Sequence, residues 1–198
     1  MSEVINSATV IAIAYLLGSI PSAYIIGRLA KGIDIQKVGD GRIGASATFH
    51  NVGALWGILV GFADFSKGAV AIFIAKNMAV SEPIVLSVGL AAIIGHDWSI
   101  FLHFEGGKGA ATTWGVLAAL MLQELLIAFS LVGVLFYFTR RSTLATAITL
   151  SSLPLLLFAL PFTEASGLLV FYAPILGIPM FIKHLSMPKP TETEIRES

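Results

Sequence analysis

The feature of this sequence that most restricts its fold is a series of apolar runs long enough to cross a lipid bilayer. Residues 4–27 carry no charge, and residues 51–75 carry only Asp64 and Lys67. A transmembrane helix needs about 20 mostly apolar residues, and a helix satisfies its own backbone polar groups in lipid. Charged residues make up 12% of the chain, against about 25% in typical soluble domains. These observations predict an all-α integral membrane protein.

Counting between charged residues gives seven predicted crossings, which form a single transmembrane bundle. They cover residues 4–27, 51–75, 83–96, 109–123, 125–139, 142–163 and 165–182. The middle crossings are short, because about 15 residues reach only about 22 Å of a hydrocarbon core roughly 30 Å thick. We therefore predict one transmembrane domain over residues 1–185. The Pro-, Glu- and Thr-rich residues 186–198 are predicted to be a disordered cytoplasmic tail.

The basic residues predict an external N-terminus and a cytoplasmic C-terminus. In this orientation ten Lys and Arg residues lie on the inner side, only Lys76 lies outside, and Lys67 lies within a crossing. The formal net charge is zero, which predicts no nucleic-acid partner, and the absence of cysteine excludes a thiolate nucleophile or metal ligand. The inner residues are Arg28, Lys31, Lys37, Arg42, Lys108, Arg140, Arg141, Lys183, Lys189 and Arg196.

A short glycine-rich motif follows the third crossing. Its glycines allow backbone N–H groups to converge on one point, where a lysine adds a full positive charge, an arrangement suited to a phosphate. The helix expected to start at Ala110 would direct its positive end and Thr112 toward the same point. The alternative is a glycine-rich turn with a solvated lysine. The motif consists of Gly106, Gly107, Lys108 and Gly109, and it is not a P-loop because glycine follows the lysine.

The first predicted cytoplasmic loop is rich in glycine and small polar side chains. Its glycines allow a ligand to approach the backbone closely, and Arg42 can bind an oxyanion through two parallel hydrogen bonds. The alternative is a flexible loop whose basic residues only follow the positive-inside rule. The candidate ligand-binding residues are Gly39, Asp40, Gly41, Arg42, Gly44 and Ser46, with His50 as a further candidate.

Ionisable residues within the crossings are the next candidates. Asp64 and Lys67 lie three residues apart, hence on one helical face, and are expected either to form a structural ion pair or to brace and line the site. His96 is either an interfacial histidine or holds the glycine motif in shape. His184, at the inner end of the last crossing, is the better general-base candidate. Thr143 opens the sixth crossing as a helix cap or an anion ligand.

With these motifs in place, the chain resembles the integral-membrane acyl-phosphate:glycerol-3-phosphate acyltransferases, the PlsY type. An element like the family's GxLxxxDxxKG is formed by Gly57–Leu59 and Asp64–Gly68, with one additional residue between Leu59 and Asp64. The element GHxWPxFxxFxGGKGxAT is matched from Gly95 to Thr112, except that Ser99 stands where proline is usual. Seven crossings with an external N-terminus are also what this family looks like. The likeness covers most of the chain.

The resemblance implies transfer of a fatty acyl group from an acyl-phosphate to the 1-hydroxyl of glycerol 3-phosphate. The product would be lysophosphatidate for phospholipid synthesis, made at the cytoplasmic side of a bacterial-type plasma membrane without cofactor or metal. Lys108 and His184, together with His50 in the place of a family arginine, are the implied catalytic residues. The implied substrate-binding residues are Gly39, Asp40, Gly41, Arg42, Gly44, Ser46, Lys67, His96, Gly106, Gly107, Gly109, Thr112 and Thr143.

The first loop departs from the family pattern and motivates two alternatives. Asp40 stands for a serine, Ala47 for an asparagine and His50 for an arginine. A divergent paralogue that acylates another polar or phosphorylated acceptor is therefore the second hypothesis. The third is an anion or phosphate transporter, but alternating access needs polar residues at both membrane faces, and the predicted outer face is bare.

Overall fold

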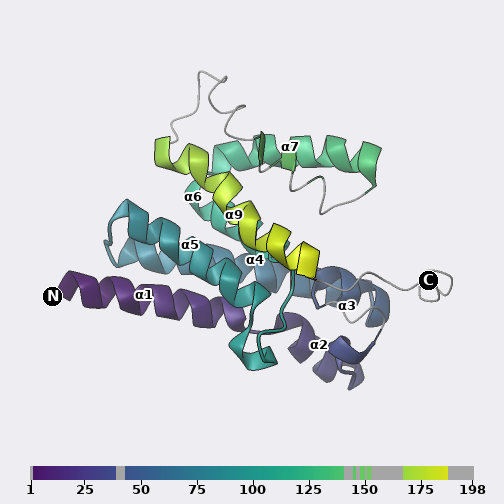
Figure 1. Ribbon diagram of the computed structural model, residues 1–198. Helices are drawn as coiled ribbons and strands as arrows, with labels where there is room; N and C mark the ends of the chain where they lie inside the picture. The colour runs from purple at the N-terminus through teal and green to yellow at the C-terminus, as the bar shows by residue number, and fades with distance from the viewer. Residues whose placement is uncertain are drawn as a thin grey trace.

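The computed structural model describes residues 2–38, 43–140, 145, 148–149, 151–152 and 167–186, and the regular structure in these ranges is helical (Figure 1). The all-α prediction is therefore confirmed. Within these ranges four segments are long and apolar enough to cross a membrane, and Ala110–Leu120 and Pro174–Lys183 are shorter apolar helices. The four segments are Val4–Lys31, Ala54–Asn77, Glu82–Leu102 and Leu122–Thr139.

The first predicted crossing is interrupted near its C-terminal end. Helix α1 (Ser2–Ser19) ends before Ile20 and Pro21, and helix α2 (Ser22–Lys31) begins immediately afterwards. Proline has no backbone N–H and cannot continue the hydrogen-bond ladder of a preceding helix. The predicted crossing at residues 4–27 lies within the candidate span Val4–Lys31, but the proline break inside it could not be detected from a count of charges.

The second and third predicted crossings agree with the structure within a few residues. A short helix α3 (Ala45–Asn51) leads into the long helix α4 (Ala54–Asn77), which is followed by α5 (Glu82–Asp97). Figure 1 shows α1 and α5 lying side by side, with α2 and α3 gathered at one end of the bundle. A 3₁₀ turn, η1 (Ile35–Lys37), lies between α2 and α3, and a second, η2 (Ile100–Leu102), follows α5.

The fourth and fifth predicted crossings meet at a different residue from the one expected. Helix α6 (Ala110–Leu120) and helix α7 (Leu122–Thr139) are separated at Met121, whereas the charge pattern predicts a boundary at Glu124. Glu124 instead lies in the first turn of α7 and is only 6% exposed. An acidic residue is favourable there because the N-terminus of a helix carries partial positive charge.

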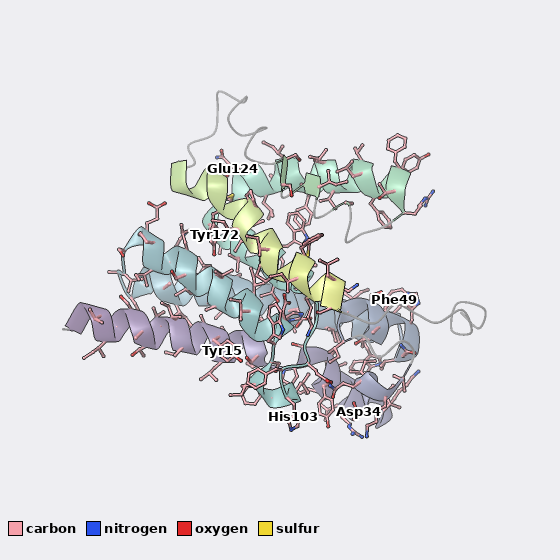
Figure 2. The ribbon with its side chains drawn as sticks, viewed as in Figure 1. Tyr15, Asp34, Phe49, His103, Glu124 and Tyr172 are labelled. Atoms are coloured by element: carbon pink, nitrogen blue, oxygen red, sulfur yellow. The ribbon has the colours of Figure 1, made fainter. Side chains whose placement is uncertain are left out.

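Helix α9 (Gly167–Ser186) closes the bundle by packing against α5 and α6. The hydroxyl of Tyr172 donates a hydrogen bond to the carbonyl oxygen of Leu86 at 2.5 Å, at the crossing with α5 (Figure 2). The helix includes Ser186, the first residue of the predicted tail. The remainder of that tail, and most of the predicted crossing at 142–163, lie outside the described residues.

Glycines allow two helix pairs, α1–α5 and α4–α6, to pack closely. A side chain at Gly18 or Gly95 would overlap backbone atoms of the facing helix in the α1–α5 pair. Gly68 and Gly115 occupy the same kind of position between α4 and α6. Small residues are typical where membrane helices pack closely, because lipid provides no hydrophobic drive and van der Waals contact must hold the helices together. These pairs fix the end of α5 relative to α1 and the start of α6 relative to α4.

Candidate active site

A small pocket lies where the α1–α2 break, the start of α3, the middle of α4 and the end of α5 meet. Six residues that the sequence singled out contribute to its lining: Gly44, Asp64, Lys67, His96, Gly106 and Gly107. These residues come from four separate stretches of the chain. The pocket therefore unites most of the described residues predicted to bind substrate around one space.

Lys67 and Asp64 form a buried ion pair on the pocket side of α4. Lys67 Nζ lies 3.0 Å from Asp64 Oδ1, and the side chains are only 6% and 4% exposed. Lys67 Nζ also donates a hydrogen bond to the carbonyl oxygen of Ile20 at 3.1 Å. That carbonyl lies in the α1–α2 break and also accepts a hydrogen bond from the Ser22 amide at 3.0 Å. The predicted pairing is confirmed, and it ties α4 to the break in the first segment.

His96 lies between this ion pair and the glycine motif. Its Nδ1 atom is 3.6 Å from Asp64 Oδ1, and its side chain is 10% exposed. On the other side of the ring, Nε2 is the atom that a side chain at Gly107 would meet first. The position agrees with the prediction that this histidine supports the shape of the glycine motif.

The glycine motif folds back onto the end of α5. The amide of Gly106 donates to the carbonyl oxygen of Asp97, and the amide of Gly107 to that of His96, each at 3.1 Å. We predicted that these amides converge on an anion, which is wrong for these two, because they satisfy the last carbonyls of a helix. Glycine is also required at position 106 on steric grounds, because a side chain there would overlap those same carbonyl oxygens.

Helix α6 begins at Ala110, as predicted, with Gly109 as its N-cap in the left-handed conformation (φ 66°). Lys108 is half-buried immediately before this cap. Thr112 is fully buried, and within the described residues its hydroxyl has no hydrogen-bond partner. The N-terminus of α6 and the Lys108 ammonium are the two sources of positive charge in the motif. Lys108, Gly109 and Thr112 are not among the residues that line the pocket.

The described part of the first loop contributes only one of its predicted site residues, Gly44, to the lining of the pocket. Gly44 is the N-cap of α3, and its carbonyl accepts a hydrogen bond from the Thr48 hydroxyl at 3.0 Å. Ser46 and His50 are exposed and are not among the residues that line the pocket. The ring of His50 instead makes an edge contact with Phe49, with 5.5 Å between centroids.

Several predicted site residues lie outside the described residues, so their placement remains a prediction. They are Gly39, Asp40, Gly41, Arg42 and Thr143, together with the side chain of His184, whose backbone lies in the last turn of α9.

Two serines at the α1–α2 break were missed as site residues. Ser19 and Ser22 line the pocket on either side of Ile20 and Pro21. Ser99, which follows α5, also lines it, and its hydroxyl donates to the Ser19 carbonyl oxygen at 2.5 Å. A proline flanked by serines inside an otherwise apolar run is the sequence signal that would have indicated this break.

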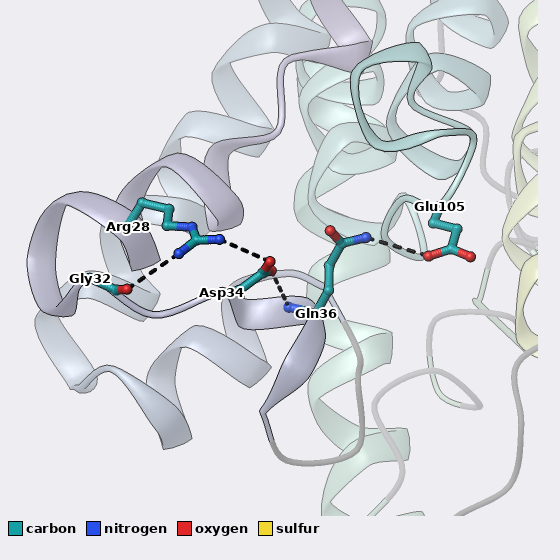
Figure 3. Close-up of polar contacts among 5 residues, drawn as sticks. All are labelled: Arg28, Gly32, Asp34, Gln36 and Glu105. Atoms are coloured by element: carbon teal, nitrogen blue, oxygen red, sulfur yellow. Dashed lines mark hydrogen bonds and ion pairs between the residues drawn. The ribbon is translucent and has the colours of Figure 1, made fainter.

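A chain of polar contacts connects the α2–η1 turn to the residue before the glycine motif (Figure 3). Arg28 Nη2 lies 3.1 Å from Asp34 Oδ2, and Asp34 Oδ1 accepts a hydrogen bond from the Gln36 amide. The side-chain amide of Gln36 then donates to Glu105 Oε2 at 3.4 Å. These contacts link the segment that leads into the first loop with the glycine motif.

Together, the fold and the pocket define a multi-pass, all-helical membrane protein with a pocket lined by polar side chains from separate stretches of the chain. A family model described as glycerol-3-phosphate acyltransferase matches residues 8–189, and the chain belongs to this family. Membership confirms the acyltransferase prediction over the transporter alternative. The protein is an enzyme that acylates glycerol 3-phosphate.

Curated relatives and solved structures agree with this assignment. A glycerol-3-phosphate acyltransferase of Endomicrobium trichonymphae is 40% identical over 169 residues, which span 82% of this chain and 85% of the relative. That of Geobacter sulfurreducens is 35% identical over 180 residues, 91% of both chains. Crystal structures of PlsY, an integral membrane glycerol 3-phosphate acyltransferase, in glycerol 3-phosphate and lysophosphatidic acid forms are 30% and 29% identical. Their TM-scores are 0.78 and 0.76, and each comparison covers 97% of this chain and 99% of the other.

Proposed function

We propose that the enzyme uses an acyl-phosphate as its donor and acylates the 1-hydroxyl of glycerol 3-phosphate. The observation that carries this proposal is that Gly106 and Gly107, directly before Lys108, line the pocket to which the α1–α2 break and the start of α3 also contribute. Both proposed substrates carry phosphate, so the site must neutralise phosphoryl oxygens on two molecules. Lys108, the α6 N-terminus and Arg42 supply that positive charge.

The transfer requires no covalent enzyme intermediate. An acyl-phosphate is a mixed anhydride already activated for acyl transfer. The hydroxyl oxygen of the acceptor attacks the carbonyl carbon, the bond to the phosphate oxygen breaks, and inorganic phosphate leaves with the electron pair. The enzyme holds the hydroxyl and the carbonyl about 3–3.5 Å apart and stabilises the developing charge. The hydroxyl proton passes to His184 or to a substrate phosphate.

The proposed topology has seven crossings, an external N-terminus and the active site on the cytoplasmic face of a plasma membrane. The positive-inside distribution supports it. The gathering of α2, α3 and the glycine motif at one end of the bundle supports it as well (Figure 1). The product would then enter the inner leaflet directly, which suits a lysophospholipid with one acyl chain.

The test is a defined reaction with purified enzyme. We expect lysophosphatidate and inorganic phosphate from acyl-phosphate and glycerol 3-phosphate in the presence of EDTA and in the absence of acyl-CoA and acyl carrier protein. Lys108→Ala is expected to lower kcat by about 100-fold or more while insertion and expression persist. Product formed only from acyl-CoA would overturn the proposed donor. Near-normal activity of Lys108→Ala would show that the glycine motif is only a turn.

His184→Ala separates the two candidate bases. A loss of about 100-fold or more in kcat assigns the base to His184, since general-base catalysis contributes about that much. A change of less than about threefold assigns it to a substrate phosphate.

A further inference from the structure

Lys183 is a cation of α9 that faces the connection between α5 and α6. It lies in the last turn of α9 and is only 8% exposed. Its Nζ atom lies 5.5 Å from the centroid of the Trp98 ring, within the range of a cation–π interaction. It also interacts electrostatically with Asp97 and Glu105, which lie on either side of η2 in the sequence. One ammonium group thus lies against the Trp98 ring and within electrostatic range of two carboxylates of the connection.

The carboxyl group of Asp97 gives a physical reason for a cation at this place. It is fully buried, and within the described residues neither of its carboxylate oxygens accepts a hydrogen bond. Its Oδ1 atom lies against Gly109, 2.6 Å from where a side chain would begin. A buried carboxylate requires nearby positive charge. Lys183 and Lys67 are the cations that interact with it, and the N-terminus of α6 adds partial charge.

The same connection is anchored to α1 on its other side. The Tyr15 hydroxyl donates to the carbonyl oxygen of Trp98 at 2.9 Å, and Ser99 reaches the backbone of Ser19. The connection is therefore fixed relative to α1. Lys183 extends that anchoring to α9, whose C-terminal end lies over the connection in Figure 1.

We propose that Lys183 is a positioning residue that holds the last turn of α9 against the α5–α6 connection. That turn carries His184, and the connection carries Lys108, so the contact sets the spacing between two residues of the reaction. This inference rests on the proposed function, in which Lys108 binds phosphate and His184 is one of the two candidate bases for the same transfer. Acyl transfer is sensitive to such spacing, because a misplacement of about 1 Å can reduce the rate about 100-fold.

Steady-state kinetics provides the first test. We expect Lys183→Met to lower kcat by about 10- to 100-fold with the KM for glycerol 3-phosphate changed less than about threefold, because the substrate contacts remain. Lys183→Arg should stay within about threefold of wild type, since guanidinium also stacks on indole and pairs with carboxylates. Lys76→Met is the matched control. Lys76 also joins two helices, through a 2.7 Å hydrogen bond to the Ala119 carbonyl, but away from the pocket, and its loss should leave kcat unchanged.

A distance measurement tests the positioning without using activity. The chain has no cysteine, so spin labels at Phe101→Cys and Leu185→Cys are specific, and both positions are exposed. We expect a narrow distance distribution in the otherwise unchanged chain and in Lys183→Arg, and a broader or shifted one in Lys183→Met.

The outcomes separate this inference from the proposed function. A low kcat for Lys183→Met with an unchanged distance distribution would overturn positioning, because Lys183 would then act directly on the reaction. A broadened distribution with normal kcat would also overturn it, since the spacing would not matter. If Lys108→Ala or the donor test fails as well, the proposed function itself is wrong.

Discussion

The imidazole of His96 lies between Asp64 and Gly107, with its Nδ1 atom 3.6 Å from Asp64 Oδ1 and its Nε2 atom against the glycine. Because the ring lies against both groups, a shift of α4 would also shift the glycine motif. Space around it is already filled, because a side chain at position 107 would overlap the ring.

Gly107→Ala is accordingly expected to destabilise the enzyme by about 1–3 kcal/mol, the usual cost of overpacking a filled site, and to lower activity. Because the overlap is with a side chain, adding His96→Ala should restore much of the lost thermal stability but not the activity. Gly133→Ala is the control, since it has open space within 4 Å and should be neutral or slightly stabilising.

Gly106→Ala provides the contrast within the same motif. Its new side chain would meet the carbonyl oxygens of His96 and Asp97, which are backbone atoms and cannot rotate away. The same His96→Ala substitution should therefore fail to restore its stability. Equal rescue of both glycine variants, measured by thermal unfolding in detergent, would contradict the described fold of the motif.

The ion pair between Asp64 and Lys67 predicts strongly non-additive substitutions. Asp64→Ala and Lys67→Met should each cost about 3–5 kcal/mol, because each leaves an uncompensated buried charge. The double variant should be more stable than the sum of the two single effects predicts. Equilibrium unfolding of the four chains gives the coupling energy, and additive losses would show that the two charges do not interact in the bilayer.

The sequence predicted the parts of this fold that depend on local pattern. The 51–75 and 83–96 crossings, the start of α6 at Ala110 and the pairing of Asp64 with Lys67 follow from apolar run length, glycine placement and helical spacing. The amides of Gly106 and Gly107 were misinterpreted because their partners, the last carbonyls of α5, become neighbours only when the chain folds back. The position of His50 outside the pocket likewise depends on how α3 packs against α4.

Ser99 occupies a position where family members usually carry proline, and its backbone suits proline. Its φ is −68°, close to the fixed value of proline, and within the described residues its amide donates no hydrogen bond. Ser99→Pro loses the hydrogen bond to Ser19 but reduces the freedom of the unfolded chain, so the net change should lie within about 1 kcal/mol. Ser99→Ala loses the hydrogen bond to Ser19 without reducing the freedom of the unfolded chain. It should therefore be less stable than Ser99→Pro in thermal unfolding.

The altered first loop predicts two different effects on acceptor binding. His50 is exposed and lies outside the pocket, so His50→Arg should change kcat/KM for glycerol 3-phosphate less than about threefold. Asp40→Ser removes a negative charge from the glycine-rich loop that is predicted to bind phosphate, and about 1 kcal/mol of repulsion corresponds to a KM about fivefold lower. Both variants are assayed with glycerol 3-phosphate varied at saturating acyl-phosphate, alongside Ser46→Ala as a control for another exposed residue of the same segment. A gain of about 100-fold or more from His50→Arg alone would contradict its placement, because it would require direct contact between residue 50 and the acceptor phosphate.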